Sequence, residues 1–236
     1  PTDVSRKIEV TVNDGLSSSN IATTTLEIIP VNDPPELVLD TTATNTDFTN
    51  TFTEDGVAVS IASSGNISVV DPDNSNIESA TVTLTNFLDG TNDVLLVNGV
   101  LPSVITAGEY DTQTGVLNLT GSATLLQYET AIGQVVYNNL SQNPNTTTRT
   151  IEVFVNDGEL SSNTATSSID IIAVNDPPVL DVDTTTTGTD YATNFTTGGT
   201  GTAVVNVGNT SVVDPDNTNI ASATVTLVNP PDGVNE

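Results

Sequence analysis

The chain has 236 residues, of which 30 are acidic and three are basic, so that its net charge is −27. Nucleic-acid binding and attachment to an anionic membrane are not expected, because no basic patch is available to neutralise phosphates. The absence of cysteine and histidine excludes disulfides, thiolate metal sites and catalysis by either side chain. No apolar run approaches the length of a membrane span, so membrane insertion of this segment is not expected either.

Alternation between apolar and polar residues predicts short strands along most of the chain. The pattern is clearest at residues 80–85, where Ala80, Val82 and Leu84 alternate with threonines. Runs rich in Thr, Ser and Asn at 41–50 and 184–200 are expected to be surface loops. The predicted strands, in chain order, lie at or near 36–40, 57–62, 80–85, 93–98, 115–119, 134–138, 151–155, 169–171 and 223–227.

Residues 122–132 are the one segment with a helical pattern. Ser122 is its expected N-cap, and Leu125, Leu126 and Ile132 are expected to face the core. Seven or more short strands in about 140 residues predict an all-β fold, an antiparallel Greek-key β-sandwich, with this single short helix added.

The chain repeats itself with an offset of 143 positions. Residues 1–93 align with 144–236 without a gap, and more than half of the aligned pairs are identical. A repeat of this length means that one domain has been copied head to tail. We therefore expect residues 1–33 to be the C-terminal strands of one repeat, 34–176 to be a complete repeat, and 177–236 to be the N-terminal strands of the next. On this interpretation the chain is a window on a longer array.

Acidic motifs recur in the repeat, and each one alone is explained by a turn or a strand end. A protein adapted to salt would also carry scattered acids without binding any ion. Together, however, the motifs can meet at the ends of a sandwich, where carboxylates about 4 Å apart repel by roughly 4 kcal/mol at an effective dielectric of about 20. Oxygen ligands of this kind select Ca²⁺. The motifs are Asn-Asp-Pro-Pro at 32–35 and 175–178, Asp-Pro-Asp-Asn at 71–74 and 214–217, Asn-Asp-Gly at 13–15 and 156–158, and Glu54-Asp55, which the next copy loses.

The pattern resembles the cadherin-like repeats of giant bacterial surface adhesins of the type I secreted kind. The resemblance is carried by the motifs at 31–35, 71–74, 115–121 and 155–158. It implies tandem Ig-like, cadherin-like domains with Ca²⁺ bound between successive domains. By this resemblance the first junction would use Asn32, Asp33, Asp71, Asp73 and Asp157, and the second junction would use Glu54, Glu129, Asn175, Asp176, Asp214 and Asp216.

These features indicate a non-enzymatic structural extender, a stretch of the shaft of a large extracellular adhesin on a bacterial cell surface. Ca²⁺ at each junction would stiffen the array, and the expected partners are the neighbouring repeats of the same chain. Two alternatives stay open. A subunit of a self-assembling surface filament or sheath would add lateral contacts between like chains, and a carbohydrate-binding module would need an aromatic platform, for which five Phe and four Tyr form no evident cluster.

Overall fold

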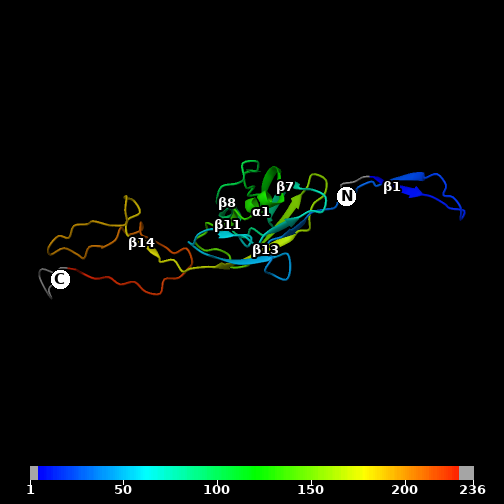
Figure 1. Ribbon diagram of the computed structural model, residues 1–236. Helices are drawn as coiled ribbons and strands as arrows, with labels where there is room; N and C mark the ends of the chain where they lie inside the picture. The colour runs from blue at the N-terminus through cyan, green and yellow to red at the C-terminus, as the bar shows by residue number, and fades with distance from the viewer. Residues whose placement is uncertain (1–4, 229–236) are drawn as a thin grey trace.

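Two sheets pack face to face at the centre of the structure, which is a computed structural model and describes residues 5–228 (Figure 1). The larger sheet has six strands, in the order β4 (Phe48–Thr53), β13 (Ala165–Ile172), β12 (Arg149–Asn156), β7 (Asn76–Leu84), β10 (Val116–Thr124) and β9 (Thr106–Ala107). The smaller sheet has three, in the order β5 (Val59–Ser60), β11 (Val135–Asn139) and β8 (Asp93–Val97), the last preceded by the 3-10 turn η1 (Gly90–Asn92). A short pair, β3 (Glu36–Val38) with β6 (Ser68–Val70), completes the central unit, residues 36–172.

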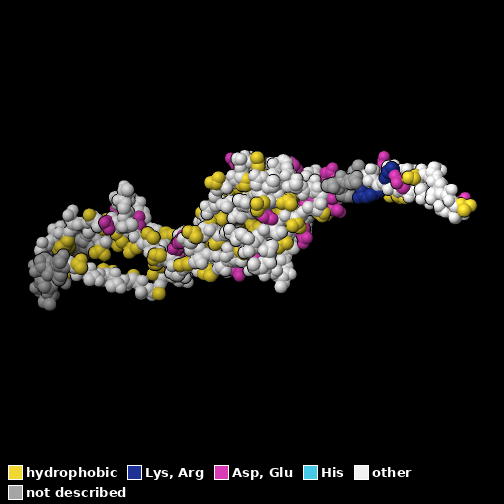
Figure 2. Space-filling model, viewed as in Figure 1, with side chains coloured by type: hydrophobic (Ala, Val, Ile, Leu, Met, Phe, Trp, Pro, Cys, Tyr) yellow, Lys and Arg dark blue, Asp and Glu magenta, His cyan; other side chains and the backbone are white. Residues whose placement is uncertain are grey.

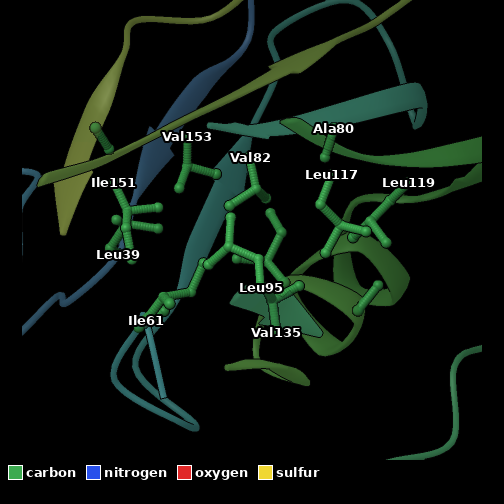
Figure 3. Packing of buried hydrophobic residues seen from close by; sticks show 14 of the residues in the cluster. Leu39, Ile61, Ala80, Val82, Leu95, Leu117, Leu119, Val135, Ile151 and Val153 are labelled. Atoms are coloured by element: carbon green, nitrogen blue, oxygen red, sulfur yellow. The ribbon is translucent and has the colours of Figure 1, made fainter. Parts of the chain in front are cut away.

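The buried residues of both sheets meet in one core (Figure 3). In β7 the predicted alternation is confirmed, because Ala80, Val82 and Leu84 are wholly buried while the threonines between them are not. Val82 lies opposite Leu117 of β10 on one side and Val153 of β12 on the other. The predicted all-β sandwich is thus confirmed, with one exception to antiparallel pairing: β4 runs parallel to β13.

The one α-helix of the described residues is α1 (Leu125–Ile132), and two details of its prediction are wrong. Its N-cap is Thr124, whose hydroxyl accepts from the backbone N–H of Gln127 while the Gln127 side chain accepts in return from the Thr124 N–H. Ser122 lies before the helix and donates instead to another strand. Leu126, predicted to face the core, is 69% exposed. The helix begins at residue 125 and buries the face formed by its first, fourth and eighth residues, which does not include position 126. That face carries Leu125, Tyr128 and Ile132.

Strand β4 occupies part of a segment predicted to be a loop. Its burial alternates, with Phe48, Asn50 and Phe52 more buried than the threonines between them, but only Phe52 is fully buried and Asn50 interrupts the apolar face. What makes it a strand is its pairing with β13, more than a hundred residues later in the chain. The sequence of β4 alone contains no information about that partner.

Two glycines at the ends of the motif at 115–121 have a steric role. Gly115 has φ +73° and Gly121 has φ +132°, conformations that other residues rarely adopt. A Cβ at these positions would lie 2.2 Å from the carbonyl oxygen of Leu84 and 2.0 Å from that of Val104. The motif therefore marks where β10 is approached closely by its neighbours at both ends.

Short two-stranded segments flank the central unit on both sides (Figure 1). The N-terminal hairpin pairs β1 (Ser5–Val10) with β2 (Ala22–Glu27) in the register of β12 and β13, so that Arg6 lies opposite Leu26 as Arg149 lies opposite Ile169. On the other side, β14 (Val179–Asp181) pairs with β15 (Ser211–Val213) as β3 pairs with β6. The expected outer segments include residues 1–4 and 229–236, which lie outside the described residues.

The strand predicted at 223–227 does not form. Val225 is 84% exposed and Leu227 is 63% exposed, and this stretch pairs with no other strand of residues 5–228. Its counterpart β7 is held between β10 and β12, and residues 223–227 have no such neighbours among residues 5–228. An extended segment without a partner cannot bury its apolar side.

Across residues 5–228, no helix has the length and apolar character required to cross a membrane.

Candidate metal centre

The second junction, where β13 leaves the central unit and continues into residues 173–178, is built by the parallel pair β4–β13. Parallel strands end at the same edge of a sheet, so Glu54, just after β4, arrives beside Ile172, the last residue of β13. The backbone N–H of Glu54 donates to the Ile172 carbonyl at 2.9 Å. The Glu54 carboxylate in turn accepts from the N–H of Val174 at 2.7 Å. This pairing therefore holds an acid of the central unit against the linker.

The following segment contributes a turn directly after β15. The Asp214 carboxylate accepts from the N–H groups of Asp216 and Asn217, at 3.0 and 2.8 Å, which closes the turn. The Asp176 N–H donates to the Asp216 carboxylate, so the linker is tied to the turn. The Asn175 side chain also reaches it, by accepting from Asn217 at 3.2 Å.

Three acids from the two sides of the linker converge at this point. One carboxylate oxygen from each of Glu54, Asp176 and Asp216 lies within 4.8 Å of the other two. Glu54 is only 3% exposed, and its Oε1 is buried with no hydrogen-bond partner. The Oδ2 of Asp176 is buried and without a partner in the same way. A positive charge at this point would stabilise the cluster, because the Oε1 of Glu54 and the Oδ2 of Asp176 are buried without partners and Asp216 is close to both residues.

The electrostatics of the cluster are unfavourable without a cation. The pKa of Glu54 is raised, chiefly by burial. A hydrogen bond from Val174 acts to lower this pKa, but the negative charges of Asp216, Asp176 and Asp55 add to the increase. Burial also raises the pKa of Asp176, again with help from Asp216. Glu54 and Asp176 thus resist ionisation because other carboxylates are close and both groups are shielded from water.

The basic side chains of the sequence are placed elsewhere. Arg6 and Lys7 belong to β1, where they appear as the dark blue patch on the N-terminal hairpin (Figure 2). Arg149 is wholly buried in the central unit and pairs with Asp89 at 2.6 Å and Asp93 at 3.0 Å. The charge of the second junction is therefore not balanced by an ion pair.

The residues of this junction fit a hard divalent cation. All the donors are oxygens, which suit Ca²⁺ and exclude soft metals. Ca²⁺ binds oxygen at about 2.4 Å, so two ligands of one ion are at most about twice that distance apart. The spread of 4.8 Å among the oxygens of Glu54, Asp176 and Asp216 lies within one such coordination sphere.

The first junction brings together the five residues predicted for it. The Asp33 N–H donates to the Asp73 carboxylate at 2.8 Å, the same contact that Asp176 makes with Asp216. The Asn32 side chain donates to Asp157 at 2.8 Å, and Asp71 accepts from the Asp73 N–H at 2.9 Å. Asp71 also has a buried oxygen, Oδ2, without a partner.

Asn74 is a member of the first junction that sequence reasoning missed. Its side-chain amide donates to Asn32 at 2.7 Å and to Asp157 at 3.2 Å. Its repeat counterpart Asn217 donates to Asn175 in the same way. The sequence does contain a signal for Asn74, because this Asn is the last residue of both Asp-Pro-Asp-Asn motifs.

The pKa of Asp157, at the first junction, is shifted in the opposite direction to that of Glu54. Burial acts to raise the pKa of Asp157, but hydrogen bonds, first of all from Asn32, outweigh burial and lower it.

Glu129, predicted for the second junction, is placed elsewhere. Its Oε1 accepts from the Val69 N–H at 2.9 Å, in the strand that pairs with β3 just after the first junction. It also lines a cavity of about 240 Å³ together with Ile67 and Leu126. The helix α1 packs against β6, and this packing directs Glu129 away from Glu54.

Comparisons with known proteins identify no family. No family model and no curated protein matches the chain. Among solved structures, the chain is similar to human CDH23 EC21-23, at 14% identity and a TM-score of 0.36, covering 91% of this chain and 55% of that one. It is also similar to a structure named BspA_C_WT, at 14% identity and a TM-score of 0.22, covering 70% of this chain and 59% of that one. The chain thus spans little more than half the length of either, and function must be argued from its own residues.

Proposed function

We propose that this chain is a structural extender of a large cell-surface adhesin, in which Ca²⁺ bound at the junctions stiffens a tandem array of β-sandwich units. The observation that carries the proposal is the convergence of Glu54, from the central unit, with Asp176 of the linker and Asp216 of the following segment. An extracellular position on a bacterial cell rests on the resemblance of the repeat motifs. The role is mechanical, and no residue is assigned to catalysis.

A cation at this position would add ionic links between the central unit, the linker and the following segment. Without it, ionised carboxylates about 4 Å apart repel by roughly 4 kcal/mol at an effective dielectric of about 20, which favours opening of the junction. With it, the same carboxylates become ligands of one ion. Because binding requires both sides, the ion stabilises the closed junction by about 2.7 kcal/mol when its concentration is about a hundred times its dissociation constant.

The first junction supports the same role with a different balance of groups. Asp33, Asp71, Asp73 and Asp157 gather there, and Asp71 has an orphaned buried oxygen. Asn32 and Asn74 supply amide donors between the acids, so part of the repulsion is already relieved.

The proposal is tested by titrating the chain with Ca²⁺ in a calorimeter and by measuring small-angle scattering in EDTA and in millimolar Ca²⁺. Mg²⁺ is the control, because it demands a tighter octahedral shell than three carboxylates at this spacing supply. We expect heat of binding and a longer, stiffer particle in Ca²⁺. Absence of binding up to millimolar Ca²⁺, with unchanged scattering, would overturn the calcium proposal.

A further inference from the structure

The loop between β11 and β12, residues 140–148, reaches over the second junction; we call it the bridging loop. The Gln142 side chain donates to the Asp55 carboxylate at 2.8 Å, next to Glu54 in the central unit. The Asn143 side chain donates to the backbone carbonyl of Pro215 at 3.1 Å, in the turn of the following segment. Two adjacent amides thus contact the acidic turns on both sides of the junction.

The bridging loop is held in shape from inside the central unit. The Ser141 N–H donates to Asn139 at 2.8 Å, the Asn143 N–H donates to Ser141 at 3.2 Å, and Pro144 is buried. The buried Arg149 donates to the Asn145 carbonyl at 3.1 Å, and Asp89, its ion-pair partner, accepts from the Asn145 N–H. The loop therefore presents Gln142 and Asn143 from a fixed base.

The partner of Gln142 occupies an unusual backbone conformation. Asp55 has φ +58° and is the one residue other than glycine with a positive φ in the described part of the chain. The next copy has Gly198 at this position, with φ +79°, and both turns close by the same 2.9 Å hydrogen bond. Glycine adopts this turn without strain, whereas Asp55 places a carboxylate there. That carboxylate accepts the hydrogen bond from Gln142.

We propose that the bridging loop is an interaction surface for the following unit, a clasp that holds the second junction closed without a cation. Its partner is the turn at 214–217, recognised through the carbonyl of Pro215. Neither amide contact needs an ion, so the clasp does not depend on calcium binding. By fixing both turns, it keeps Glu54, Asp176 and Asp216 facing one another while the junction is empty.

The test measures the distance between two spin labels in EDTA. Because the chain has no cysteine, spin labels attach only where one is introduced. The two sites are Glu109→Cys in the central unit and Thr187→Cys in the following segment, both at exposed positions. The variant is Gln142→Ala with Asn143→Ala. The matched control is Gln113→Ala with Asn98→Ala, which changes the same residue types in exposed loops away from the junction. In EDTA we expect the open population to rise about fivefold in the variant, the effect of losing ordinary hydrogen bonds, and to stay unchanged in the control.

A single substitution, Asn143→Asp, provides a second test in case the double variant perturbs the loop. It keeps the shape of the side chain but replaces its amide donor with a carboxylate facing a carbonyl oxygen, and we expect the same opening in EDTA. Distance distributions equal to the wild type in both variants would overturn the clasp. Failure of the wild-type distribution to narrow on adding Ca²⁺ would instead count against calcium binding, so the two proposals fail separately.

Discussion

The backbone N–H of Asp176 donates to the carboxylate of Asp216, and 143 positions earlier that of Asp33 donates to Asp73. The linker and the turn that follow one β-sandwich are therefore built twice in the same way. At the second of these sites Glu54 of the central unit lies beside this pair, and the Oε1 of Glu54 and the Oδ2 of Asp176 are buried without a hydrogen-bond partner. The convergence of these three acids leads to the first prediction.

Replacing Glu54 by Gln is expected to have opposite effects with and without calcium. In Ca²⁺ the variant loses a charged ligand, and we expect the affinity of the second junction to fall at least tenfold, about 1.4 kcal/mol. In EDTA the variant removes a buried, uncompensated charge, so the junction should open less than in the wild type. Calorimetry and the spin-label distance measure the two effects. Glu152→Gln, at an exposed position of β12, is the control and should change neither. A loss of closure in EDTA as well would contradict this account.

The raised pKa of Glu54 predicts how the empty junction responds to pH. A carboxyl whose pKa is higher in the closed state than its ordinary 4.5 binds its proton more tightly when the junction is closed. Closure in EDTA should therefore strengthen as the pH falls from neutral through the raised pKa, and should stop strengthening below about 4.5. In Ca²⁺ the trend reverses, because protons compete with the ion. An NMR titration of the Glu54 carboxyl, with spin-label distances across the same range, checks both statements. A pKa at or below 4.5 would refute the prediction.

Breaking the buried ion pairs of Arg149 should destabilise the central unit. Arg149→Met leaves Asp93, wholly buried, and the largely buried Asp89 without their cation, and it removes two hydrogen bonds to the bridging loop. We expect a loss of about 3–5 kcal/mol in the free energy of unfolding, measured by chemical denaturation. The control is Arg6→Met at the same repeat position in the exposed N-terminal hairpin, which should cost far less. Equal effects of the two substitutions would show that burial of the ion pair is unimportant.

A pair of leucines tests the orientation of α1 and the core beneath it. Leu84 is wholly buried, and Leu84→Ala should cost about 2–5 kcal/mol through lost burial and the cavity left behind. Leu126 is 69% exposed, so Leu126→Ala should change the free energy of unfolding by less than about 0.5 kcal/mol. Chemical denaturation of the two variants is the measurement. A large effect at Leu126 would mean that the helix is turned toward the core by a different face.

Much of the fold follows from short-range sequence patterns. The alternation at 80–85 predicts β7 because every second side chain of a strand faces the core. The pattern at 122–132 predicts the helix to within a few residues. The cap is Thr124 and not the expected Ser122, because Thr124 has Gln127 three positions later, the spacing of a capping box. The motif repeat also indicated which acids belong together, since each copy places its linker next to its Asp-Pro-Asp-Asn turn.

Local sequence patterns are enough to predict the elements whose signal lies within a few residues: the strands that alternate, the turns, and the repeated motifs that join Asp33 to Asp73 and Asp176 to Asp216. Contacts between distant segments are needed to know that β4 pairs in parallel with β13, which brings Glu54 to the linker, and that α1 packs on β6, which holds Glu129 away from it. The physical reason is that periodicity records which side of a segment is buried. It does not record which distant segment covers that side, and the junction depends on contacts between segments more than a hundred residues apart.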